Sequence, residues 1–340
     1  PDTYRGGVWL FAGVHSREWT LEHEETLFVF SRLLWMLYNG KYNVEATKSS
    51  SEVAKYQAAT VSGHEAGPQM TLVETALPME GEKMTERTYK LIRGSLRYAR
   101  LFLNETADNV PDSWLPWDEH KGEGQRLDEW IGRTLTTGWE IAVSREARGI
   151  EFREIDKNED VWDRLMNFDI EKHAQLRSSL NYRRFRPPED DNEANAKGYN
   201  ITPWNMLRWL LAASSNAYKW CAPPPAGNDE SSQLKKLDLL ERWSENIDSF
   251  CQVNVSLERA DESSKQNTVF LSVSNGCKRP VPEDYKKPDG TLGALESIAR
   301  NMGCNFRARL LNGQELEEIL PGEEYGFTVS IELPAFIFEN

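Results

Sequence analysis

Residues 207–220, LRWLLAASSNAYKW, form the segment from which the fold can be worked out. Most of them are apolar at the spacing of a buried helix, and Thr202 and Pro203 predict its start because threonine caps a first turn and proline fits its first position. Asn216 and Lys219 interrupt the apolar pattern three residues apart, so they share one face. An amide oxygen suits hydrated magnesium and an ammonium suits phosphate, so the pair indicates nucleotide binding. Two solvent-facing residues at a helix end are the alternative.

The segments around this helix alternate between helical and strand patterns. Upstream, apolar residues from Leu127 to Leu135 predict a helix, and residues 149–155 predict a strand. Downstream, a helix is expected at 292–302, and strands are expected at 252–257, 268–273, 306–311 and 327–333. These elements predict an α+β fold with a mixed sheet and helices on one face.

The first third of the chain has a different organisation. Two helical segments, 51–76 and 85–104, are joined by a turn and predict a helical hairpin. Such a hairpin buries too little apolar surface alone, so we expect it to form a four-helix bundle in a homodimer. Residues 1–40 hold one strand and one helix, which suggests the last part of a preceding domain.

Composition limits the class of protein. The 340 residues carry a formal charge of −14, which argues against a surface that coats nucleic acid. The basic stretch YRRFR at 182–186 is the local exception, and we expect it to be ordinary surface charge. No apolar run is long enough for a membrane span. The four cysteines lack metal or disulfide spacing, which favours a reduced, cytoplasmic setting.

The helix and the strands after it resemble a known family in order and spacing. LLAASSNAYKW at 210–220 is similar to the asparagine box of histidine-kinase-type (GHKL) ATPases. Residues 253–257, 269–276, 290–298 and 327–334 then resemble that family's strand, first glycine box, second glycine box and final strand. The resemblance covers residues 126–336 and implies a GHKL-type α/β sandwich over residues 115–340.

This resemblance implies a site for ATP and Mg²⁺. Asn216 would hold the metal, and the nucleotide would contact Lys219, Asn275, Gly276, Gly290 and Gly293. Upstream, SGHE at 62–65 resembles the family's phosphoacceptor box, so His64 would be the phosphorylated nucleophile and Glu65 its base. Residues 45–110 would then be the dimerisation and phosphotransfer hairpin. A surface histidine on a helix is the alternative.

Residues 1–40 resemble the end of a GAF sensor domain. Together the three segments imply a cytoplasmic sensor histidine kinase of a two-component system. Such a protein phosphorylates itself and passes the phosphoryl group to the receiver domain of a response regulator. No nucleic-acid partner is expected.

Several positions depart from the family pattern. Ala212 stands where a second asparagine is usual, Asn275 replaces an aspartate that reads adenine, and Leu292 and Ala294 replace glycines. A neutral amide lacks the charge-assisted part of that adenine bond. These departures leave open a catalytically degenerate dimeric module that acts by protein contact. A stand-alone ATPase that uses nucleotide to switch conformation is a third hypothesis.

Overall fold

The computed structural model describes most of the chain after residue 113. The described residues are 85, 91–92, 95, 114–118, 122–148, 150–170, 175–178, 180–187, 198–223, 233–250, 253–259, 268–277, 291–311 and 326–340. The GAF-like segment 1–40 lies outside them, as does most of the expected hairpin 45–110. Within that hairpin, Leu91, Ile92 and Ser95 are described, helical and buried.

A five-stranded mixed sheet is the centre of the fold. Its strands, in spatial order, are β3 (Gln175–Ser178), β5 (Val253–Arg259), β6 (Thr268–Gly276), β8 (Gly326–Pro334) and β7 (Asn305–Leu310). The pair β3–β5 is parallel, and the other three pairs are antiparallel. Two small antiparallel pairs lie outside this sheet: β1 (Trp117–Asp118) with β2 (Glu123–Gly124), and β4 (Arg184–Phe185) with β9 (Phe338–Glu339).

The sheet has one apolar face and one polar face. Along β8, Phe327, Val329, Ile331 and Leu333 are buried, and the residues between them are partly exposed. This alternation places the apolar residues on one face of the sheet. On the other face, hydroxyl groups pair across β6 and β8, namely Ser272 with Ser330 at 2.8 Å and Ser274 with Thr328 at 2.9 Å.

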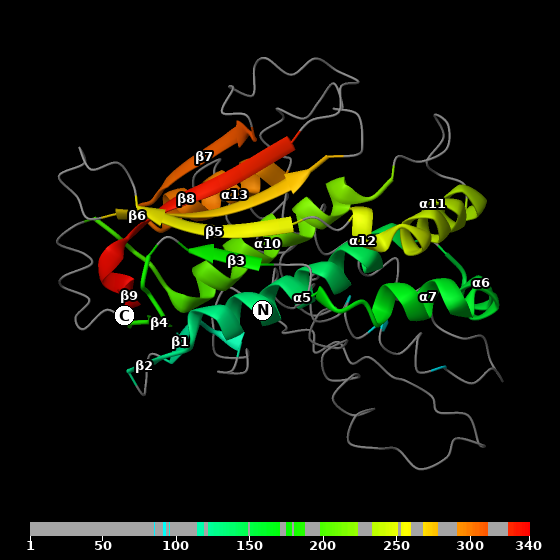
Figure 1. Cartoon of the computed structure of the whole chain (residues 1–340), viewed down its shortest axis with the longest axis horizontal. Coiled ribbons are helices and arrows are strands. Elements are labelled where there is room, and N and C mark those ends of the chain that lie inside the picture. The colour runs from blue at the N-terminus through cyan, green and yellow to red at the C-terminus, as the bar shows by residue number, and fades with distance from the viewer. Residues whose placement is uncertain are drawn as a thin grey trace, which may run out of the picture.

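Helices cover the apolar face (Figure 1). Helix α10 (Pro203–Cys221) contacts β5 and β6, α13 (Thr291–Asn301) contacts β7, and α5 (Leu127–Glu146) packs on α10. Four more helices complete the described part: α6 (Phe152–Lys157), α7 (Glu159–Met166), α11 (Gln233–Glu245) and α12 (Ile247–Phe250). A 3-10 turn, η5 (Ala335–Ile337), leads from β8 to β9.

Helix α10 lies between the sheet and α5, and its sequence explains both contacts. The Thr202 hydroxyl accepts a hydrogen bond from the Asn205 backbone N–H at 3.2 Å, which satisfies one free donor of the first turn. Fifteen of the nineteen residues of α10 are buried, as a helix in contact on two sides requires. Small residues allow the close approach of α5, because Gly138 lies directly against Ser214.

Most of the predicted elements from residue 115 onward are present. Helix α10 begins at Pro203 as expected, and the four strands and the helix predicted at 292–302 occur with nearly the same bounds. The mixed sheet with helices on one face is therefore confirmed for the described residues. The four-helix bundle falls outside them and stays a prediction.

The strand expected at residues 149–155 is wrong. Residues from Phe152 onward form α6, with Ile150 and Ile155 fully buried. Helix α6 contacts α7, and no described strand lies beside it to complete a ladder. Packing among the helices has therefore overridden the alternating pattern.

No helix among the described residues is both long and apolar enough to span a bilayer.

Candidate functional site

Two backbone contacts fix the direction of α10 relative to α13. The Asn200 backbone N–H donates to the Met302 carbonyl at 3.0 Å, and Gly303 lies against the backbone of Gly198. Both glycines have positive φ angles, of 79° at residue 198 and 71° at residue 303, which side chains disfavour. The start of α10 therefore lies beside the end of α13.

The sheet register shows which strand ends lie at the other end. Strand β7 follows α13 directly, with Asn305 opposite Glu332 at its start and Leu310 opposite Phe327 at its end. On β6, Asn275 also pairs with Phe327. The last residues of β6 therefore lie away from Met302, at the end toward which α10 runs (Figure 1).

This arrangement brings the sequence-predicted residues to one end of the sandwich. We call it the Asn275 end and define it by the last turns of α10, the end of β6 and the start of α13. Asn216 and Lys219 lie in the last two turns of α10, Asn275 and Gly276 end β6, and Gly293 lies in the first turn of α13. The fold thus gathers residues from three separate chain segments.

Asn216 is buried, with 9% of its surface exposed. Its Oδ1 accepts a hydrogen bond from the indole Nε1–H of Trp220 at 3.2 Å, one helical turn further on. A carbonyl oxygen has two lone pairs, so Oδ1 retains capacity for a second partner. The amide is therefore oriented within the site before any ligand arrives.

Lys219 and Trp220 are partly exposed at the end of α10. The Lys219 ammonium lies 6.0 Å from the centre of the Trp220 ring, at the outer limit of a cation–π contact. The ammonium therefore lies near the indole ring whose N–H donates to Asn216. A partly exposed ammonium at this helix end suits a phosphate-bearing ligand.

Asn275 is buried at the end of β6, on the face that the helices cover. Its Nδ2 donates to the Cys277 sulfur at 3.2 Å. The side chain therefore presents its oxygen as an acceptor, which an adenine amino group requires. Gly276, the next residue, is partly exposed.

The remaining predicted site residues are described in part. Gly293 lies within α13, where it is partly exposed, and Ala212 is buried on α10. His64, Glu65 and Gly290 lie outside the described residues, so their roles stay predictions.

The described residues do not contain a cluster of three or more side chains typical of a structural metal site. Magnesium commonly needs one or two protein ligands and completes its shell with water and phosphate oxygens. A single protein oxygen such as Asn216 Oδ1 is therefore enough to take part in magnesium binding.

Two features of this region were not predicted from the sequence. The Asn216–Trp220 hydrogen bond joins residues four apart on one helix, a spacing that the sequence did contain. The contact between Asn275 and Cys277 had no such signal, because it depends on the chain path after β6.

Another cysteine, Cys304, is buried between α13 and β7. Burial is the main cause that raises the pKa of its thiol to about 12, and the charge of Glu332 adds to the effect. The thiol therefore stays protonated at neutral pH and is unsuited to nucleophilic chemistry.

Comparison with known proteins gives little further identification. No protein-family model and no curated protein matches the sequence. Among solved structures, the histidine kinase domain from the Erythrobacter litoralis EL346 blue-light activated histidine kinase matches with a TM-score of 0.32 and 8% identity. That match covers 92% of this chain and 94% of the other. A similarity this distant establishes neither a shared family nor a shared activity.

Proposed function

We propose that the Asn275 end binds ATP with magnesium and that the chain is a sensor histidine kinase. The observation that carries the proposal is the convergence of Asn216, Lys219 and Asn275 at one end of an α/β sandwich. These residues come from α10 and β6, and the start of α13 lies at the same end. They supply an amide oxygen, an ammonium and a second amide, which suit a metal, a phosphate and a base respectively.

Each residue then has a separate role. Asn216 would hold the metal through Oδ1, Lys219 would pair with a phosphate, and the Asn275 oxygen would accept from the adenine amino group. Gly290 and Gly293 would let the backbone approach the phosphates at the start of α13. Bound magnesium would neutralise phosphate charge as the γ-phosphoryl group is transferred.

The acceptor in this proposal is His64. Its imidazole nitrogen forms the new N–P bond as the bond between the γ-phosphorus and the bridging oxygen breaks, and ADP leaves. Glu65 accepts the proton from the other ring nitrogen. The phosphoryl group then passes to an aspartate of a response-regulator receiver domain. In a cytoplasmic homodimer, the hairpin of each chain would contribute one such histidine.

A second candidate function is a catalytically degenerate dimeric module that acts by protein contact. Two features favour it: the Asn216 oxygen already accepts a hydrogen bond from Trp220, and Asn275 is almost wholly buried. The buried Ala212 also removes one possible metal contact. These features would weaken nucleotide binding without disturbing the fold.

Autophosphorylation with γ-labelled ATP and magnesium tests the proposed function. The expected result is acid-labile label on the wild-type chain that His64→Gln and Asn216→Ala both abolish. Asn205→Ala is the matched control, because Asn205 lies on the same helix but at its opposite end. Absence of label on the wild type, together with absence of ATP binding, would favour the degenerate module.

A further inference from the structure

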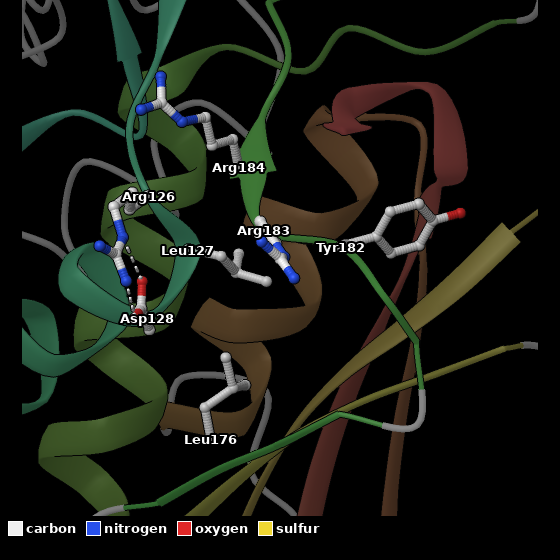
Figure 2. A pocket seen from close by; sticks show the side chains of 7 residues that line it. All are labelled: Arg126, Leu127, Asp128, Leu176, Tyr182, Arg183 and Arg184. Atoms are coloured by element: carbon white, nitrogen blue, oxygen red, sulfur yellow. Dashed lines mark hydrogen bonds and ion pairs between the residues drawn. The ribbon is translucent and has the colours of Figure 1, made fainter. Parts of the chain in front are cut away.

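The structure also contains a hollow of about 470 Å³. It is formed by the start of α5, by β3 and by the chain leading into β4 (Figure 2). The side chains that line it are Arg126, Leu127, Asp128, Leu176, Tyr182, Arg183 and Arg184, and we call it the arginine hollow. It includes most of the basic stretch that the sequence predicted to be ordinary surface charge.

The arginines of the hollow lie toward the opposite end of the sandwich, whereas Leu176 on β3 lies level with Val255 and Val273, nearer the Asn275 end. The Arg183 backbone N–H donates to the Glu339 carbonyl at 2.7 Å, and β9 follows β8 after one short turn. Strand β8 begins opposite Gly276 and has nine residues, which corresponds to a length of about 30 Å. A phosphoryl group held by Arg183 and Arg184 would therefore lie away from Asn216 and Asn275.

The backbone that carries the arginines is held on two sides. The Leu127 N–H donates to the Arg183 carbonyl at 2.9 Å, and the Phe185 N–H donates to the Gln125 carbonyl at 3.0 Å. Phe185 is buried and packs edge-on against Trp130, with ring centres 5.0 Å apart. Because the scaffold is fixed, little backbone ordering would accompany binding.

The charges in the hollow are unbalanced. Arg126 is neutralised by Asp128, at 2.8 Å, and by Glu129, at 3.4 Å. For Arg183 and Arg184 the described part of the chain contains no carboxylate ion-pair partner. The whole chain carries a charge of −14, so two such arginines beside a third are a local exception. Figure 2 shows Arg183 and Arg184 extending in different directions from the chain, and the positive charge that each adds to the lining favours an anionic ligand.

We propose that the arginine hollow binds a phosphoryl oxyanion. Guanidinium groups pair with phosphate oxygens through two parallel N–H bonds, which a carboxylate or a phosphate can accept. The volume is typical of a small-molecule site and exceeds the needs of a lone inorganic ion. Leu127, Leu176 and the ring of Tyr182 provide apolar wall for the organic part of a phosphomonoester. This proposal does not depend on nucleotide binding at the Asn275 end.

Calorimetric titration of the whole chain with inorganic phosphate and with phenyl phosphate tests it. Neither probe carries a base, so neither reports on the proposed adenine contact. We expect both to bind, more weakly as sodium chloride is added. Tighter binding of phenyl phosphate would identify an organic monoester as the ligand type, and equal binding would identify free phosphate.

The double variant Arg183→Gln/Arg184→Gln should weaken binding of either probe by about tenfold or more, because the lining loses the positive charge of both arginines. Arg164→Gln is the matched control, since Arg164 is exposed on α7 and does not line the hollow. Thermal melts without ligand check that each variant folds. If the double variant unfolds at a lower temperature than the wild type, the titrations use the single variants Arg183→Gln and Arg184→Gln instead. Undetectable binding by the wild type, or equal binding by the arginine variants, would overturn the proposal.

Discussion

The Asn216 oxygen accepts from Trp220, so the proposed metal ligand already has one partner within its own helix. Trp220→Phe removes the indole N–H and leaves a ring of similar size. We expect binding of magnesium with ATP to tighten about fivefold, since one neutral hydrogen bond contributes about 1 kcal/mol. Fluorescent-nucleotide titration with magnesium measures the change.

Trp204→Phe provides the matched control for that substitution. Trp204 lies at the start of the same helix, and its indole nitrogen has no partner within the described residues. Its replacement should leave nucleotide affinity unchanged. Equal affinities for wild type and Trp220→Phe would argue against a metal-binding role for the Asn216 oxygen.

Cys304 provides a prediction about alkaline pH. Its thiol pKa is raised to about 12 in the folded chain, so between about pH 9 and pH 12 the unfolded chain loses a proton that the folded chain keeps. Stability must therefore fall as pH rises through this window, by at most about 1.4 kcal/mol per pH unit. Urea unfolding at several pH values, compared with Cys304→Ala, measures this loss. Identical pH dependence of the two proteins would contradict the burial of the thiol.

At the scale of helices, α5 and α10 approach each other closely at Gly138. A Cβ atom at Gly138 would collide with the Ser214 side chain, whereas one at Gly132 of the same helix would meet nothing within 4 Å. Gly138→Ala should therefore lower the free energy of unfolding by about 1–3 kcal/mol. Gly132→Ala should raise it by up to about 1 kcal/mol.

Urea denaturation of the two alanine variants measures both effects. The pair changes the same residue type in the same helix, so intrinsic helix propensity contributes equally to each. A gain of stability in both variants would show that α5 and α10 do not approach as closely as described.

The elements that local sequence determines were predicted well. Thr202 and Pro203 specify the start of α10, and alternating residues from Phe327 to Leu333 specify β8. The strand expected at 149–155 failed because Ile150 and Phe152 alternate locally, while packing among the helices decides the outcome. Strand β3 has too few residues for a pattern, and it is defined by its parallel pairing with β5.

The candidate sites differ in how far sequence could predict them. Asn216 and Lys219 stand out because they are polar within a buried helix. The arginine hollow could not be predicted, because Arg126 joins Arg183 and Arg184 only through the hydrogen bonds that clamp β4 beside the start of α5. Sites built by distant segments require the tertiary structure.

At the scale of the whole molecule, the expected hairpin makes an assembly prediction. Two hairpins would bury the apolar stripes that one cannot, so the chain should be a homodimer. Light scattering after size-exclusion chromatography should give about twice the 39.0 kDa of one chain. A mass of one chain at every concentration tested would contradict the bundle.

Direct titration of the whole chain with ATP and magnesium tests nucleotide binding at the Asn275 end. Calorimetry should detect binding by the wild type and by Asn205→Ala. Asn216→Ala should lose at least about tenfold in affinity, because the substitution removes the proposed metal ligand. If the wild type releases or absorbs no heat with ATP, or if Asn216→Ala binds as tightly as Asn205→Ala, the Asn275 end is not a nucleotide site.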